Sequence, residues 1–152
     1  MSLRKKNKVK TSGIDDETVK KLLVDHSAII LNLKKHGVLR TNRLVSDVGA
    51  FFVCKRLGLN RVSNPVELGY DALDDKGLKY FIKARKLRAG VKPTVFTVFE
   101  SQLKYSDFFV YVDFDDMWDM VRLLKIPSNK IVPNLYNRVR ITNDLVENYS
   151  II

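Results

Sequence analysis

The segment that most constrains the fold of this chain is 108–113, with the sequence Phe-Phe-Val-Tyr-Val-Asp. It is nearly all apolar and ends at an acidic residue. A continuous apolar run of this length is typical of a β-strand that is covered on both faces. We therefore expect a layered domain in which this strand lies inside a sheet.

Two helical patterns precede the expected sheet. Apolar residues recur at roughly helical spacing between Asp15-Asp16 and Gly37, and again from residue 41 to Gly58. Glycine commonly ends a helix because it adopts the left-handed conformation at little cost. The apolar positions of the first helix are Val19, Leu22, Leu23, Ile29, Ile30 and Leu33.

A β-hairpin is expected next. Residues 70–73 and 78–85 have strand patterns, and the Asp-Asp-Lys-Gly sequence at 74–77 is typical of the turn between them. With this turn at the centre, facing residues have numbers that sum to about 151, so Asp71 faces roughly Tyr80.

The remaining segments complete a mixed pattern. Residues 94–99 predict a strand, Asp115 or Asp116 is expected to cap a short helix that runs to Leu124, and residues 130–141 predict one or two weak strands. The order of elements predicts an α/β fold with a mixed central β-sheet flanked by helices and with an added N-terminal helix.

Length and composition fit one domain. The chain has 152 residues, of which 45% are apolar, and this is enough for a hydrophobic core. We expect a flexible basic arm over residues 1–14 and a single domain over residues 15–152. One cysteine and two histidines leave no disulfide framework and no zinc site. No apolar run is long enough to span a membrane and no secretory signal is evident, so we expect a cytoplasmic protein without a membrane partner.

Positive charge is concentrated in two places. The chain has 27 Lys and Arg against 17 Asp and Glu, which gives a formal net charge of +10. The N-terminal arm, with Lys5 and Lys6, is either a solvated tail or a phosphate-binding segment. The second concentration overlaps a predicted strand, and a basic surface on a folded element favours nucleic acid as the partner. Its residues are Lys76, Lys79, Lys83, Arg85, Lys86, Arg88 and Lys92.

Asp71 and Lys83 are the candidate catalytic residues, one on each strand of the expected hairpin. The twist of a two-stranded ribbon can bring their side chains together at one end. A carboxylate that holds a divalent cation and an ammonium that neutralises a phosphate suit the hydrolysis of a phosphodiester. The alternative is a surface hairpin with ordinary charges.

The hairpin resembles the central hairpin of PD-(D/E)XK nucleases, the restriction-endonuclease-like superfamily. The resemblance rests on Gly-Tyr-Asp-Ala at 69–72, the acidic turn that ends at Gly77, and Lys-Tyr-Phe-Ile-Lys-Ala-Arg at 79–85. The order of further segments is similar to that of small bacterial members, over about residues 22 to 132. These segments are 36–41, 46–53, 57–59, 105–108 and 126–127.

The resemblance implies a restriction-endonuclease-like fold and a Mg²⁺- or Mn²⁺-dependent DNA endonuclease. Asp71 matches the metal-binding aspartate of that family and Lys83 matches its catalytic lysine. Two further positions, a glutamate on the preceding helix and an acid or glutamine two residues before the lysine, fall on Ala50 and Phe81. Neither of these side chains can bind a metal.

Two other carboxylates could replace the missing ligands. Asp47 lies one helical turn before Ala50, and Glu67 lies just before the strand of Asp71. The expected metal ligands are therefore Asp71, Asp47 and Glu67. Because Mg²⁺ requires oxygen ligands in a near-octahedral array, a domain that kept the fold and the basic surface but lost cleavage is the competing interpretation.

Three functions remain open at this point. The first is a metal-dependent DNA endonuclease, which would need two active sites, and hence a homodimer, to cut both strands. The second is a catalytically inactive nuclease-fold module that binds DNA. The third is an interaction domain whose basic face binds an acidic protein. The residues expected to bind nucleic acid are Lys79, Arg85, Lys86, Arg88, Lys92, Lys5 and Lys6.

Overall fold

The computed structural model describes residues 13–152, so Lys5 and Lys6 of the basic arm lie outside the described residues. Contacts divide the chain into two compact units, residues 1–37 and residues 38–152. The first helix falls within the first of these units.

The N-terminal unit contains helix α1 (Asp16–Lys35), close to the bounds expected from the sequence. Asp15 caps the helix, since its side chain accepts a hydrogen bond from the backbone N–H of Thr18 at 2.8 Å. Acidic residues occupy the first turn and lysines the last, as the helix dipole favours. No residue of α1 is buried.

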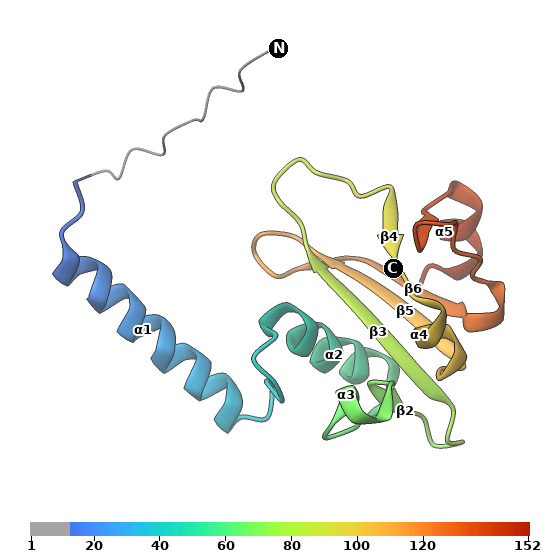
Figure 1. Cartoon of the computed structure of the whole chain (residues 1–152), viewed down its shortest axis with the longest axis horizontal. Helices are drawn as coiled ribbons and strands as arrows, with labels where there is room; N and C mark the ends of the chain where they lie inside the picture. The colour runs from blue at the N-terminus through green and yellow to red at the C-terminus, as the bar shows by residue number, and fades with distance from the viewer. Residues whose placement is uncertain (1–12) are drawn as a thin grey trace, which may run out of the picture. The chain divides into compact units, whose positions relative to one another are not determined.

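The second unit is an α/β fold around a five-stranded sheet with the strand order β1-β2-β3-β5-β6 (Figure 1). The β3–β5 pair is parallel and the other pairs are antiparallel, so the sheet is mixed as expected. Its strands are β1 (Asn60–Arg61), β2 (Ala72–Leu73), β3 (Lys79–Lys86), β5 (Phe108–Phe114) and β6 (Met120–Pro127). A separate antiparallel pair consists of β4 (Val95–Thr97) and β7 (Arg138–Arg140).

The two faces of the five-stranded sheet carry separate hydrophobic cores. Helix α2 (Leu44–Leu57) packs on one face, against a core that includes Ile82 and Val112. The β4–β7 pair and helix α5 (Asn143–Tyr149) pack on the other face, where the ring of Phe96 stacks on those of Phe109 and Tyr111. The segment expected to lie inside the sheet, now β5, is confirmed as a strand covered on both sides.

Helix α2 approaches β3 closely because a glycine lies at the contact. A Cβ atom placed on Gly49 would overlap the Cβ of Ala84. The helix ends at Gly58, whose φ of 65° lies in the left-handed region. The second predicted helix is therefore confirmed, and its small residues set its distance from the sheet.

The hairpin is confirmed, but its register differs by one residue from the expectation. Ala72 pairs with Tyr80, so Asp71 aligns with Phe81 rather than with Tyr80. Asp74 donates its backbone N–H to the carbonyl of Leu78 at 3.1 Å, which leaves a loop of three residues, 75–77, in place of the four-residue turn. Three-residue hairpin loops commonly carry a glycine with positive φ, and Gly77 has a φ of 79°.

The short helix expected up to Leu124 is wrong, because residues 120–127 form strand β6. Asp115 closes the turn between β5 and β6 instead of capping a helix: its Oδ1 accepts hydrogen bonds from the backbone N–H groups of Met117 and Asp119, both at 2.9 Å. Leu123 and Leu124 are both fully buried although they point to opposite faces of the sheet. A strand covered on both faces lacks the alternation that would distinguish it from a helix.

Short elements complete the second unit, and the sequence patterns did not predict its short helices. These are α3 (Pro65–Leu68), α4 (Glu100–Lys104), the 3₁₀ turn η1 (Ser128–Lys130) and α5. The strand patterns at 94–99 and 130–141 correspond to β4 and β7. Within residues 13–152, no helix has the length and apolar character needed to cross a membrane.

Gly49→Ala is expected to lower the free energy of unfolding by about 1–3 kcal/mol, because the added methyl group overlaps Ala84 and pushes α2 away from β3. Equilibrium unfolding in urea measures this change. The double variant Gly49→Ala/Ala84→Gly removes the overlap and should recover part of the loss. A double variant that is no more stable than Gly49→Ala would contradict this account of the contact.

Candidate functional site

The side chain of Arg40 connects Asp47 in the first turn of α2 with Asp71 at the start of the hairpin. Its Nε donates to Asp47 Oδ1 at 3.3 Å, and its Nη2 donates to Asp71 Oδ1 at 3.2 Å. Its Nη1 donates to the backbone carbonyls of Val62 at 2.6 Å and Asp71 at 3.2 Å. One cation therefore joins three segments that are far apart in the sequence.

Asp47 is buried and binds the segment that precedes its own helix. Its Oδ2 accepts hydrogen bonds from the backbone N–H groups of Arg40 at 3.0 Å and Thr41 at 2.6 Å, and from the Thr41 hydroxyl at 2.9 Å. Burial acts to raise the pKa of Asp47, but the hydrogen bonds from Thr41 and Arg40 outweigh it and hold the pKa below its ordinary value. Asp47 is therefore an ionised carboxylate with protein donors on both oxygens.

Asp71 is also held by donors on both oxygens. Its Oδ2 accepts a hydrogen bond from the backbone N–H of Ile82 at 2.9 Å, and its Oδ1 contacts Arg40. Burial raises the pKa of Asp71 above its ordinary value, although the Ile82 hydrogen bond and the charge of Arg40 oppose the rise. The Ile82 N–H and Arg40 therefore favour the charged form of Asp71, which burial disfavours.

A small pocket adjoins the two aspartates. Its volume is about 110 Å³, well below that of pockets that enclose drug-sized ligands. Arg40 and Arg43 line it together with Asp47 and Asp71, so its formal charges balance. The other lining residues are Thr41, Ser46, Pro65, Val66, Phe81 and Ile82.

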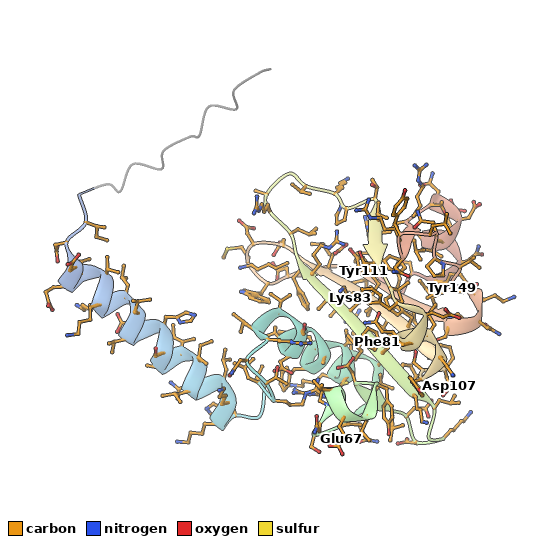
Figure 2. The ribbon with its side chains drawn as sticks, viewed as in Figure 1. Glu67, Phe81, Lys83, Asp107, Tyr111 and Tyr149 are labelled. Atoms are coloured by element: carbon orange, nitrogen blue, oxygen red, sulfur yellow. The ribbon has the colours of Figure 1, made fainter. Side chains whose placement is uncertain are left out.

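Lys83, the candidate catalytic lysine, does not line this pocket. It lies on β3 two residues after Phe81 and is half-buried beside Tyr111, its register partner on β5 (Figure 2). Burial, together with the nearby charge of Arg85, lowers the pKa of the Lys83 ammonium below its ordinary value. The structure therefore brings Asp71 together with Asp47 and Arg40, and leaves Lys83 outside that pocket.

Glu67 lies apart from the aspartates as well. It is exposed on α3, and its carboxylate accepts a hydrogen bond from the side-chain amide of Asn64 at 2.8 Å. It lines a second, open groove together with Phe81 and Tyr105 rather than the pocket that contains Asp71. The proposed metal ligands thus divide into Asp47 and Asp71 in one pocket and Glu67 in another.

Apolar side chains occupy the two positions at which the resemblance would imply polar metal-site residues, Ala50 and Phe81. Ala50 is fully buried in the core beneath α2. The ring of Phe81 stacks on that of Phe109, with 5.7 Å between the ring centroids. Both residues therefore serve the packing of the domain.

The residues present do not fit the divalent-cation site that the resemblance implies. Asp47 and Asp71 already accept hydrogen bonds on both oxygens, and the positive charge between them belongs to Arg40. Among the described residues, no group of three or more His, Cys, Asp and Glu side chains is placed to hold a metal ion. Mg²⁺ is commonly bound through one or two carboxylates and several waters, so the obstacle here is the guanidinium of Arg40, which already lies between the two carboxylates.

The expected nucleic-acid-binding residues differ in how far they are exposed. Lys79, Lys86, Arg88 and Lys92 are exposed on β3 and on the loop after it. Arg85 is half-buried, and its Nη2 donates to the backbone carbonyl of Val95 at 3.0 Å. Arg85 therefore helps to hold β4 to the sheet, whereas the four other basic side chains are exposed, with the ammonium groups of Lys79 and Lys86 over the rings of Tyr70 and Trp118.

Two further basic residues extend this surface, and the sequence patterns did not single them out. Arg138 and Arg140 of β7 are exposed and pair with Thr97 and Val95 of β4, directly after the loop that carries Arg88 and Lys92. The buried Val139 lies between them. This alternation of basic and apolar residues was the available sequence signal for a strand with one charged face.

A second buried carboxylate lies on the face covered by β4. Asp113 is fully buried, and its Oδ1 accepts a hydrogen bond from the Tyr111 hydroxyl at 2.7 Å. Its Oδ2 has no hydrogen-bond partner among the described residues, although Arg122 Nη1 lies 3.5 Å away. Burial raises the pKa of Asp113, while the Tyr111 hydrogen bond and the charge of Arg122 oppose the rise.

Neither a protein-family model nor a curated protein matches the sequence of this chain. Its function is therefore inferred from the contacts, burial and charges of its own residues.

Arg40→Met is expected to lower the free energy of unfolding by about 3–5 kcal/mol, because it leaves two carboxylates in the domain interior without their counter-charge. Urea unfolding at neutral pH gives the change. The control is Arg43→Met in the same pocket, where the exposed side chain should contribute no more than about 0.5 kcal/mol. Equal effects of the two substitutions would show that Arg40 is not the internal counter-ion.

Asp113→Asn is expected to remove a pH-dependent part of the stability. Because the folded-state pKa of Asp113 is raised, the folded protein binds more protons than the unfolded chain, and stability falls as pH rises from about 3.9 through the folded-state pKa. The stability of Asp113→Asn relative to the natural chain should therefore increase across this interval. Urea unfolding from about pH 3.5 to 7 measures the difference, and a difference that stays constant or falls would refute the raised pKa.

Proposed function

We propose that this chain is a DNA-binding protein of restriction-endonuclease-like fold that does not cleave DNA. The observation that carries the proposal is the position of Arg40, whose guanidinium binds the oxygens of Asp47 and Asp71 that a metal-dependent nuclease would need for its cation. Basic residues of β3, the following loop and β7 remain exposed. The chain thus has a surface suited to phosphate binding without a ligand set suited to hydrolysis.

Membership of the PD-(D/E)XK superfamily is part of this proposal. It is supported by the antiparallel β2–β3 hairpin, by the parallel β3–β5 pair that follows it, and by helix α2 before the hairpin. Asp71 immediately precedes β2 and Lys83 lies in β3, as the resemblance implies. The departures at Ala50 and Phe81 agree with a fold that is retained for binding.

The exposed charge suits the DNA backbone. Arg88 and Lys92 lie on the loop between β3 and β4, and Arg138 and Arg140 lie on the neighbouring strand β7. Such residues bind phosphates largely without regard to sequence, and each neutralised phosphate releases counter-ions. The net charge of +10 adds long-range attraction to a polyanion.

A second candidate is the Mg²⁺- or Mn²⁺-dependent endonuclease. One observation favours it: Asp71 aligns with Phe81, and Lys83 lies two residues further along β3, with the side chains of Phe81 and Lys83 on the same face by alternation. The hairpin therefore keeps the relative placement of aspartate and lysine that the family uses. This candidate ranks second because Arg40 and the protein donors already occupy Asp71.

Arg88→Ala/Lys92→Ala is expected to weaken binding of duplex DNA and to reduce its salt dependence. Because the variant leaves two phosphates without their neutralising side chains, the slope of log K against log salt should fall by about 1.8. Fluorescence anisotropy with a labelled duplex over a series of salt concentrations measures both effects. The matched control is Lys55→Ala/Arg56→Ala on α2, which removes the same two residue types from the helix on the opposite face of the sheet. Equal effects in the two variants would contradict a localised binding surface.

The same protein preparations decide between binding and cleavage. Incubation of supercoiled plasmid with Mg²⁺, with Mn²⁺ and with EDTA is expected to show no metal-dependent nicking. Nicking that requires metal and is abolished by both Asp71→Ala and Lys83→Ala would establish the endonuclease instead. If the protein neither nicks nor binds DNA at moderate salt, the result would favour the third function, in which the basic face binds an acidic protein.

A further inference from the structure

Helix α1 carries an apolar stripe that is largely exposed among the described residues of its own unit. The stripe follows helical spacing and is interrupted at its middle by His26. Leu22, Leu23 and Ile29 are 57%, 61% and 58% exposed. The complete stripe consists of Val19, Leu22, Leu23, His26, Ile29, Ile30 and Leu33.

Such a helix gains most of its stability from packing of its apolar face. Isolated helices of this size are marginal in water, and a contiguous apolar surface usually marks a site of association. The stripe runs from Val19 to Leu33 of the 20-residue helix, over a length of about 21 Å. A long, narrow apolar surface of this kind fits another helix better than it fits a small ligand.

The first and last turns of α1 carry charges of opposite sign, and two lysines, Lys20 and Lys21, follow the acidic first turn. Asp16 and Glu17 lie in the first turn, and Lys34 and Lys35 lie in the last turn. Two parallel copies would place like charges together at each end. Two antiparallel copies would place the acidic turn of each helix beside the basic turn of the other, with opposed helix dipoles.

We propose that α1 is a dimerisation helix that pairs with α1 of a second copy of this chain in an antiparallel arrangement. A two-fold axis through the middle of the helices generates this pairing, so one stripe serves as both halves of the interface. His26 lies near this axis, midway between the charged ends. This inference rests on α1 alone and is independent of the proposed DNA binding.

The size of the stripe sets the expected strength of the dimer. A surface one helix wide and about 21 Å long is small beside interfaces of about 1,200–2,000 Å² that give tight complexes. The dimer is therefore concentration-dependent, and its dissociation constant is expected to be in the micromolar range, about 1–100 μM. Two DNA-binding surfaces would then be joined in one particle at high local concentration.

Sedimentation equilibrium of the full chain from about 1 to 300 μM brackets this range and tests the pairing. The natural chain should pass from monomer to dimer, and Leu22→Lys/Ile29→Lys should remain a monomer. The matched control is Val24→Lys/Leu31→Lys, which changes two equally exposed apolar residues on the opposite side of the same helix and should still dimerise. A natural chain that stays monomeric throughout, or a control that fails to dimerise to the same extent, overturns the proposal.

A charge-swapped chain tests the orientation without altering the stripe. It combines Asp16→Lys and Glu17→Lys with Lys34→Glu and Lys35→Glu, so it should form antiparallel dimers with itself. Mixed with the natural chain, it should form few heterodimers, because each antiparallel heterodimer places like charges together at both ends. Preferential heterodimers, measured with two fluorescent labels, would instead require a parallel pair and would overturn the antiparallel arrangement.

Discussion

The contacts of Arg40 fix the part of the domain where α2 meets the hairpin. Its guanidinium binds Asp47, Asp71 and the carbonyl of Val62, so helix, hairpin and the segment between them share one cation. Arg43, the N-cap residue of α2, makes no capping hydrogen bond with its side chain. Asp47 instead accepts hydrogen bonds from the backbone N–H groups of Arg40 and Thr41, just before the helix. Because a buried charge without its partner is costly, this arrangement has little freedom to change.

Local signals in the sequence predicted much of the fold, and long-range interactions account for what they missed. The apolar run at 108–113 and the glycine-containing turn are signals carried by a few neighbouring residues. The strand and the hairpin that they predict are both present. Strand β6 was missed because Asp115, before an apolar segment, matches a helix cap as well as a hairpin turn. The role of Arg40 was missed because Asp71 lies 31 positions away, and spacing alone carries no signal for such an ion pair.

Arginine and a metal ion neutralise carboxylates in different ways. The Arg40 charge is covalently part of the chain and cannot exchange with ions in solution, as a bound metal can. Together with Arg43, which also lines the pocket, Arg40 balances the charges of Asp47 and Asp71, so this pocket contributes little net field to attract a phosphate. Under the proposed function, attraction of DNA comes from side chains outside the pocket, such as Arg88, Lys92 and the arginines of β7.

The loop over residues 87–94 is anchored by hydrogen bonds that do not depend on its own side chains. Arg85 donates to the carbonyl of Val95 just after the loop at 3.0 Å, and Arg122 donates to the carbonyl of Pro93 at 3.1 Å. Every residue has a backbone carbonyl, so side chains such as Arg88 can change while both anchors remain. The charge that this loop presents can therefore vary through evolution with little effect on the stability of the domain.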